Sequence, residues 1–353
     1  MSSLSASGRE RILAIGDSYM SVNVFANAFD GDDRIAADIE FRSIDAARQG
    51  SGAWATSQVH ESEGSPQQID KWLDGHSILI VHGAPVTREL LERNPSVRFV
   101  ACARGGPANV DLEAAEELGV KVTTTPGKNA PAVADLTIGF LVDLWRNLGD
   151  ARRYVSHTAS HGLPLAESTF EGARWFGREL SGARLGLVGL GHVATLVAHR
   201  ARALGLDVVA FDPFVPYDSA PTVRRANTLD ELLDVSDALS LHARATSENR
   251  HMIGERELSR LADDAILINT ARESLVDEHA LLNTLRAGRL RGVAMDVCEP
   301  DGPWRELVAD PRVVLTPHIG GATHETLDRG ARMLREEVDR YLRGEPLRWS
   351  VSA

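Results

Sequence analysis

The chain is poor in cysteine and contains no long apolar run. It has two cysteines, Cys102 and Cys298, in 353 residues, so we expect no disulfide framework and no cysteine–histidine metal cluster. No run approaches the ~20 apolar residues that span a bilayer. The opening stretch, MSSLSASGRE, lacks the apolar core of a secretory signal. The sequence therefore predicts a cytoplasmic protein with neither a membrane nor a metal as partner.

Positive charge is also scarce. The chain has 38 Lys and Arg against 50 Asp and Glu, a formal net charge of -12, and no basic block compensates. Nucleic acids and anionic membranes both require a basic face, so we expect neither as a partner. What remains is an ordinary globular composition, 43% hydrophobic and 25% charged, in a chain long enough for two domains.

The first half alternates short β-branched runs with helical stretches. Residues 111–119 predict a helix, because an Asp precedes it, acids occupy its first turn and a Gly ends it. This alternation predicts a parallel sheet covered by helices. The expected strands lie at 11–15, 77–81, 97–101 and 121–124.

The alternation restarts in the second half, after a helix predicted at 130–148 and a looser stretch at 150–181. The apolar runs here are nearly continuous, as in strands buried on both faces, and predict a second doubly wound sheet. A final helix at 326–342 either closes this domain or crosses back to the first. The six expected strands lie at 184–188, 207–211, 238–241, 265–269, 292–297 and 312–316.

Three small residues follow the first of these strands. Gly189 permits a tight turn, Gly191 lets a pyrophosphate approach the main chain, and Ala194 lets helix and strand pack closely. The helix that starts at His192 and Val193 offers unpaired N–H groups and the positive end of its dipole to phosphates. The strand–turn–helix context favours a dinucleotide site, although a glycine turn that merely packs is the alternative.

Asp212 ends the next strand, about twenty residues on, where a carboxylate accepts hydrogen bonds from a ribose 2′-hydroxyl. It would repel a 2′-phosphate, and the following Pro213 and Phe214 supply no arginine to bind one. The sequence therefore predicts NAD as the cofactor rather than NADP. The alternative is that Asp212 is a solvated strand end.

Polar residues also follow the last three predicted strands: Arg272, then Glu299 and Asp301, then His318. Ligands of open α/β sheets bind outside the carboxyl ends of the strands. A guanidinium holds a carboxylate in two hydrogen bonds, an imidazole transfers protons near neutral pH, and a carboxylate stabilises the imidazolium. Together they suit reduction of a 2-keto acid, although each alone fits a surface charge, a turn former or a loop histidine.

Several segments make residues 97 to 342 resemble the D-isomer-specific 2-hydroxyacid dehydrogenases, which include 3-phosphoglycerate dehydrogenase-like enzymes. The resemblance implies that His318 is the general acid/base and that Arg272 binds the substrate carboxylate and polarises the carbonyl. Asp301 would be the carboxylate partner of His318, with Glu299 as the alternative. The segments are VDLEAAEELGVKVTTTPGKNAPAVAD, GRELSGARLGLVGLGHVA, NTARESLVDEHAL, GVAMDVCEPDGP and LTPHIGGAT.

The resemblance also implies two doubly wound parallel-sheet domains. A flavodoxin-like substrate domain would comprise residues 1–127 and 325–353, and a Rossmann-type NAD domain residues 128–324. The active site would lie in the cleft between them, with closure excluding water.

A homodimer is implied as well, formed through a segment at about 131–181. Trp175 and the apolar helix at 132–145 would be buried in that interface.

The chain departs from the family pattern at three places. Asp301 stands where Glu is usual, and Gly302 follows where Pro is usual. Glu273-Ser274 replace a common Gly-Gly after Arg272. The substrate loop reads ACARGGPANVD, residues 101–111, instead of a Gly-x-Gly-x-Asp version.

That loop suggests substrate contacts. Arg104 is placed to read a second anionic group, a phosphate or another carboxylate, unless it faces solvent or pairs with an acid. The successive amides of Gly105 and Gly106 form a nest for the substrate carboxylate.

Further cofactor contacts are expected in the second half. Asp296 would hold the nicotinamide carboxamide, and Thr270 and Ala271 would line the same edge. His242 either flanks the adenosine or lies in a surface loop.

Three functions fit these residues: an NAD-dependent dehydrogenase of D-2-hydroxy acids, a dinucleotide-sensing corepressor-like binding protein, and a formate- or phosphite-type dehydrogenase. The sequence does not name the acid or the direction of reaction.

Overall fold

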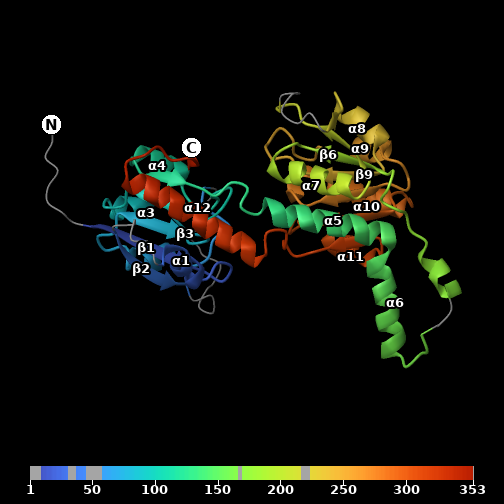
Figure 1. The fold of residues 1–353 in the computed structure, drawn as a ribbon, viewed down its shortest axis with the longest axis horizontal. Coiled ribbons are helices and arrows are strands. Elements are labelled where there is room, and N and C mark those ends of the chain that lie inside the picture. Colours follow the sequence, from blue (N-terminus) through green and yellow to red (C-terminus); the bar gives the residue numbers. More distant parts are fainter. Residues whose placement is uncertain (1–8, 31–36, 45–57, 166–168, 216–222, 353) are drawn as a thin grey trace. The chain divides into compact units, whose positions relative to one another are not determined.

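The structure, a computed structural model, describes residues 9–30, 37–44, 58–165, 169–215 and 223–352, so the opening stretch up to residue 8 lies outside it. The chain divides into two compact units (Figure 1). Unit 1 is Met1–Lys128 with Thr323–Ala353, and unit 2 is Asn129–Ala322. No helix within the described ranges is long and apolar enough to cross a membrane.

The sheet of unit 1 has six strands in the described residues, in the order β13-β5-β4-β3-β1-β2. All pairs are parallel except β13 with β5. Leaving out β13, this is the flavodoxin-like order 2-1-3-4-5. The sequence prediction missed β2, a half-exposed edge strand, and β13, which has two residues. The strands are β1 Glu10–Gly16, β2 Ala37–Ser43, β3 Ile78–Val81, β4 Phe99–Cys102, β5 Lys121–Thr123 and β13 Ser350–Val351.

Alternate residues of the unit 1 strands build two cores, because successive side chains of a strand point to opposite faces. Leu13 and Leu79 pack under α2 Pro66–Asp70, α3 Arg88–Arg93 and α4 Leu112–Glu117. Neighbouring residues, including Ile12 and Ile78, pack under the helices α1 Val22–Phe29 and α12 His324–Leu342.

The last helix, α12, belongs to unit 1. Its residues Ala331, Leu334 and Val338 are fully buried against that sheet, so the helix crosses back to the first unit rather than closing the second. The capped helix predicted at 111–119 is α4, and the Asp111 carboxylate accepts the Ala114 N–H as a cap.

The sheet of unit 2 has seven described strands in the order β12-β11-β10-β9-β6-β7-β8. The reversal between β9 and β6 is the switch point of the Rossmann fold, where dinucleotides bind. Six strands agree with the prediction, and the two-residue β8 was missed. The strands are β6 Arg184–Val188, β7 Asp207–Phe211, β8 Arg224–Arg225, β9 Ala238–Leu241, β10 Ile266–Asn269, β11 Gly292–Met295 and β12 Val313–Leu315.

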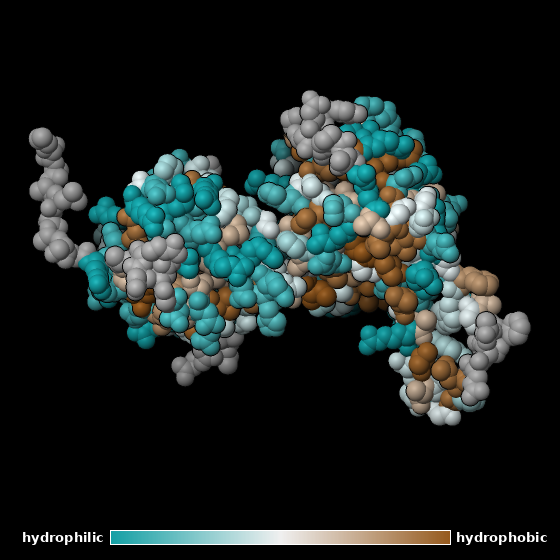
Figure 2. All heavy atoms as spheres, in the orientation of Figure 1, coloured by the Kyte–Doolittle hydropathy of each residue, from teal (hydrophilic) through white to brown (hydrophobic). Residues whose placement is uncertain are grey.

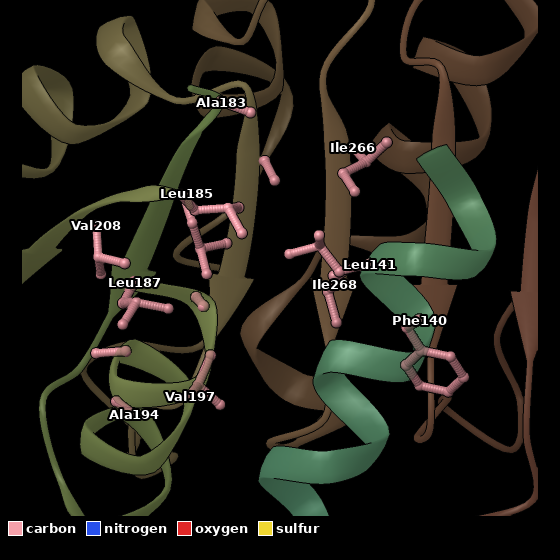
Figure 3. Packing of buried hydrophobic residues seen from close by; sticks show 14 of the residues in the cluster. Phe140, Leu141, Ala183, Leu185, Leu187, Ala194, Val197, Val208, Ile266 and Ile268 are labelled. Atoms are coloured by element: carbon pink, nitrogen blue, oxygen red, sulfur yellow. The ribbon is translucent and has the colours of Figure 1, made fainter. Parts of the chain in front are cut away.

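Helices cover both faces of the unit 2 sheet. On one face, Leu141 and Val197 pack in the same core as Leu187 and Ile268 of the sheet (Figure 3). They come from α5 Ala130–Arg146 and α7 His192–Ala203. The other face carries α8 Leu229–Val235, α9 Glu255–Arg260, α10 Glu278–Arg286 and α11 Trp304–Ala309.

The structure corrects two expectations about residues 130–181. The stretch expected to be loose begins with a helix, α6 Leu148–Ser160, which follows a left-handed Asn147 with φ 54°. The sequence did not predict this helix because it has no buried apolar face; only Thr158 is buried on it. The apolar side chains of α5 are buried without a dimer partner, since Phe140 and Trp145 lie in the core of unit 2. Trp175 is half-buried against Tyr154, with ring centroids 5.7 Å apart.

Glu337 joins three elements of unit 1. It is fully buried in α12, and its Oε2 accepts the Thr123 hydroxyl of β5 at 2.9 Å and the N–H groups of Arg348 and Trp349, just before β13, at 3.0 and 3.2 Å. Hydrogen bonds to a buried charge contribute roughly 1.5–3 kcal/mol each.

We therefore expect Glu337→Gln to lower the free energy of unfolding by about 1–3 kcal/mol in urea titrations, because an amide nitrogen cannot accept these bonds. Glu336→Gln is the control, since Glu336 is exposed and pairs with surface Arg348. Equal stabilities of the two variants would contradict this role for Glu337.

Candidate active site

The glycine turn after β6 combines a main-chain conformation that favours glycine with open space. Gly189 has φ 91°, and a Cβ there would lie 2.9 Å from main-chain atoms of His242 and Ala243. A Cβ on Gly191 would meet no atom within 4 Å. Ala194 is fully buried against the sheet. The fold itself thus requires glycine at 189, whereas Gly191 leaves room for a ligand.

The turn leads directly into α7. Gly191 is the N-cap, and its carbonyl accepts the Thr195 N–H at 3.0 Å, the first bond of the helix. The amides of His192 and Val193 precede that bond and have no carbonyl partner within the helix, as at any helix start. Together with the helix dipole they can bind a phosphate.

Asp212 ties the glycine turn to the end of β7. Its Oδ2 accepts the Leu190 N–H at 2.8 Å, and its Oδ1 accepts the N–H groups of Phe214 and Val215 at 2.9 and 3.2 Å. The residue is half-exposed, so the carboxylate retains acceptor capacity for ribose hydroxyls while it positions the turn.

An arginine does lie beside Asp212 in space, although Pro213 and Phe214, which follow it in the sequence, supply none. Arg225 of β8 donates from Nη2 to the carbonyl oxygens of Asp212 and Val215, at 2.6 and 3.1 Å. The sequence argument missed it because Arg225 is thirteen residues from Asp212 and only strand pairing brings it back. Its Nη2 hydrogen bonds go to main-chain carbonyls.

His242 lies next to the glycine turn rather than in a remote surface loop. Its carbonyl is the group that a Cβ on Gly189 would strike, and its Nε2 is 2.9 Å from the Ser240 hydroxyl. Burial lowers the pKa of His242 to about 3, so the ring is uncharged at neutral pH.

At the end of β10, buried Asn269 shapes the turn that presents Arg272. The Asn269 side chain donates to the Arg272 carbonyl at 2.9 Å and accepts the Ala271 N–H at 3.0 Å. Arg272 is exposed, and its Nη1 donates to the Ala271 carbonyl at 2.7 Å. Thr270 points back to α5, with its hydroxyl 3.1 Å from that of Thr137. Sequence reasoning missed Asn269, although it stands directly before the candidate residues.

At the end of β11, Asp296 supports the loop that carries His318. Asp296 is 2% exposed, and its carboxylate accepts the Thr316 hydroxyl at 2.6 Å and the N–H groups of Ile319 and Gly320 at 2.7 Å each. The His318 N–H donates to the Asp296 carbonyl at 3.0 Å. A Cβ on Gly320 would lie 2.8 Å from Asp296 Oδ2, which explains the glycine there. Binding of a carboxamide by Asp296 stays a prediction.

These bonds hold His318 in a conformation that it would not adopt alone. Its φ is 56°, in the left-handed region, which costs a residue with a Cβ roughly 1–2 kcal/mol. The side chain is nevertheless exposed. A strained, exposed histidine on a loop fixed by a buried carboxylate is typical of a functional position.

The carboxylate partner of His318 stays a prediction. Asp301 is exposed, and in the described ranges neither Asp301 nor Glu299 forms a hydrogen bond or ion pair with His318. Glu299 instead pairs with Arg250, whose Nη2 is 2.7 Å from Glu299 Oε1.

Glu278 explains one departure from the family pattern. It is 3% exposed, accepts the Glu299 N–H at 2.8 Å, and has its pKa raised by burial and by the charges of Glu299 and Glu273. A Cβ on Gly302 would lie 2.5 Å from Glu278 Oε2. The usual proline cannot be accommodated here unless Glu278 moves. The sequence does not indicate this, because Glu278 reads there as an ordinary helix start.

The candidate substrate loop of unit 1 follows β4. Arg104 donates from Nη1 to the Glu61 carbonyl at 2.7 Å and pairs with the Glu61 carboxylate, so the alternative of pairing with an acid is observed. Gly105 and Gly106 are exposed, and a Cβ on Gly106 would meet no atom within 4 Å. Their role as an anion nest stays a prediction.

Comparison with known proteins identifies the family. The profile of the D-isomer specific 2-hydroxyacid dehydrogenase, NAD binding domain, matches residues 138–320. This chain belongs to the D-isomer-specific 2-hydroxyacid dehydrogenase family. The matched range contains Gly189, Asp212, Arg272 and His318, and the cofactor is NAD, as the sequence predicts.

Named relatives agree with this assignment. The chain is 35% identical to a hydroxypyruvate reductase of Thermotoga maritima over 270 residues, which are 75% of this chain and 84% of that one. It is 32% identical to a D-3-phosphoglycerate dehydrogenase of Methanocaldococcus jannaschii over 280 residues, 78% of this chain but 52% of that one. It therefore spans about half the length of that relative. The crystal structure of the TT0316 protein of Thermus thermophilus superimposes with a TM-score of 0.76 at 31% identity, covering 97% and 99% of the two chains.

Asp296→Asn tests the support of the His318 loop. An amide nitrogen would face the N–H of Ile319 or Gly320, so at least one bond to the buried group is lost, worth roughly 1.5 kcal/mol. We expect amide exchange at residues 319 and 320, followed by mass spectrometry, to accelerate about tenfold or more. Asp301→Asn, on an exposed side chain, should leave the exchange unchanged. Unaltered protection in Asp296→Asn would contradict the role.

Proposed function

We propose that this chain is an NAD-dependent dehydrogenase that interconverts a D-2-hydroxy acid and its 2-keto acid. The observation that carries the proposal is that the NAD-domain sheet presents exposed Arg272 and His318 at the carboxyl ends of β10 and β12, each on a turn fixed by a buried polar side chain. Strained main-chain conformations cluster at functional sites, which supports a functional role for His318. The relatives named hydroxypyruvate reductase and D-3-phosphoglycerate dehydrogenase support this class of substrate.

Each residue has a separate role in the reaction. The bound cofactor would accept the hydride as NAD during oxidation and supply it as NADH during reduction. Arg272 holds the substrate carboxylate with its planar fork and polarises the carbonyl. His318 gives a proton to the carbonyl oxygen during reduction and removes it from the hydroxyl during oxidation. We assign stabilisation of the imidazolium to Asp301, since the Glu299 carboxylate is paired with Arg250.

Other groups bind rather than react. The amides of His192 and Val193 bind the pyrophosphate, Asp212 binds the ribose, and Thr270, Ala271 and Asp296 line the nicotinamide side. In unit 1, the amides of Gly105 and Gly106 bind the substrate carboxylate. We also propose a cytoplasmic location, since Cys102 and Cys298 are both unpaired.

We further propose a homodimer formed through α6 and the segment that follows it. Large apolar side chains gather on this part of the surface (Figure 2) although α5 is satisfied within unit 2. Isolated exposed apolar residues are ordinary, but a contiguous set marks an interface. The set is Leu148, Val155, Leu163, Leu165 and Phe176, each 46–81% exposed.

His318→Ala is expected to lower kcat with NADH and a reactive 2-keto acid by roughly 10²–10⁴-fold, the usual contribution of a general acid. NADH affinity, measured by fluorescence titration, should change little. His279→Ala, an exposed histidine of α10, is the matched control. Unchanged turnover in His318→Ala would refute the role of the imidazole.

A panel of 2-keto acids, formate and phosphite, with NADH/NAD and NADPH/NADP in parallel, separates the competing functions. Turnover of a 2-keto acid with NADH supports the proposal. Oxidation of formate or phosphite alone would indicate a formate- or phosphite-type dehydrogenase. NADH binding without any turnover would favour a dinucleotide-sensing binding protein.

The dimer is tested by Val155→Glu combined with Leu163→Glu. Two buried charges at an apolar interface cost several kcal/mol, so light scattering after gel filtration should show the dimer mass fall to that of a monomer. Leu204→Glu, on an exposed leucine of unit 2 outside this set, should leave the mass unchanged. A monomeric wild-type chain would refute the proposal.

A further inference from the structure

One lysine of unit 1 is buried without a partner. The chain has only three lysines; Lys71 and Lys121 are exposed, whereas Lys128 is 7% exposed. Its Nζ makes no hydrogen bond in the described ranges. Burying an ammonium without a hydrogen-bonding or charged partner is costly, so such a group is retained where it binds something.

Lys128 ends a turn that joins it to the candidate substrate loop. Its N–H donates to the Thr125 carbonyl at 3.3 Å, and the Thr125 N–H donates to the Arg104 carbonyl at 2.8 Å. The Thr125 hydroxyl is also buried without a partner in the described residues. The turn therefore holds two unpaired polar side chains beside the loop of Arg104.

Helix α12 is shaped to accept this lysine. Arg329 donates to the Lys128 carbonyl. A Cβ on Gly330 would lie 2.9 Å from Lys128 Cδ, so the glycine leaves room for the lysine stem. Glycine inside a helix costs roughly 1 kcal/mol relative to alanine. The buried position of Lys128 is thus accommodated by a residue that otherwise weakens the helix.

The nearby titratable groups do not pair with Lys128. Asp17 acts on it electrostatically, but its Oδ2 accepts Gly83 N–H at 2.6 Å and lies 3.0 Å from His82 Nδ1. Burial raises the pKa of the Cys102 thiol to about 11, so it carries no charge. Arg104 is a second cation.

Burial, together with the charge of Arg104, lowers the pKa of Lys128 to about 8. The ammonium is therefore still mostly protonated at neutral pH and lacks a counter-charge of its own. A bound anion would supply that charge and accept its hydrogen bonds.

We propose that Lys128 and Arg104 form an anion subsite at the carboxyl edge of the unit 1 sheet, which binds a second anionic group of the substrate. The substrate class is then a 2-keto or 2-hydroxy acid with a distal carboxylate, phosphate or sulfonate. The inference rests on the proposed function, in which the carboxylate next to the carbonyl is bound by Arg272. Arg104 would turn from Glu61 toward the ligand.

The test compares singly and doubly anionic substrates in wild type, Lys128→Met and the control Lys71→Met. Glyoxylate and pyruvate represent the first class; oxaloacetate, 2-oxoglutarate, phosphohydroxypyruvate and sulfopyruvate represent the second. We expect wild type to prefer at least one doubly anionic acid in kcat/KM. Lys128→Met should lose about 10–100-fold on that acid, the worth of a charged hydrogen bond, and little on glyoxylate. Lys71→Met should match wild type.

The outcomes that overturn the subsite are distinct from failure of the proposed function. A wild-type preference for single anions, an equal loss on both classes, or no loss at all would each refute it. A melting temperature of Lys128→Met well below wild type would indicate a structural lysine, whereas removal of an unpaired charge should not destabilise. No turnover of any 2-keto acid would instead refute the proposed function.

A pH profile of Lys128→Arg provides an independent readout. The protonated amine binds the anion, so the wild-type KM for the doubly anionic acid should rise above about pH 8 and that for glyoxylate should not. Arginine stays charged, so Lys128→Arg should keep a flat KM over this range. The groups near Lys128, namely Asp17, His82, Cys102, Arg104 and Arg329, are unchanged in that comparison. A rise that persists in Lys128→Arg would contradict the subsite.

Discussion

The buried carboxylate of Asp296 is the contact on which the candidate active site depends. It stands at the end of β11, and its own N–H donates to the carbonyl of Asn269, at the end of β10, at 2.9 Å. From there it accepts the N–H groups that follow His318. The parallel pairing of β10, β11 and β12 brings the three strand ends together. An exposed, strained histidine is therefore held by its own main-chain N–H and by the amides that follow it.

A buried carboxylate also fixes loops in unit 1. Asp17, buried at the end of β1, accepts the N–H groups of Met20 and Gly83, at 2.7 and 2.6 Å. Burial alone would raise its pKa, but the hydrogen bonds from His82, Met20 and Gly83 hold the pKa below its usual value. A charged carboxylate thus fixes the loops after β1 and β3 in the unit that carries Arg104 and Lys128. In both units, a buried carboxylate accepts hydrogen bonds from the amides of loops at the sheet edge and so helps to fix these loops.

One departure from the family pattern, Gly302, has a cause that a motif does not reveal. Gly302 follows from the position of Glu278, whose carboxylate occupies the space of a Cβ. Arg104 is paired with Glu61, which lies 43 residues away in the chain. The polar helix α6 forms although it buries a single residue, so no apolar periodicity marked it.

The sequence by itself determined the two sheets, the glycine turn and the order of Arg272, Asp301 and His318, because buried strands are apolar runs and the turn residues have fixed spacing. The edge strands β2, β8 and β13 were not predicted, since a short or half-exposed strand has no run of apolar residues. Only tertiary structure decided what Asp296, Arg225 and Lys128 touch. The partners of these side chains, or the lack of one, depend on which distant segments the strand pairing and α12 bring beside them. The chemistry of a side chain does not indicate which segment of the chain will lie next to it.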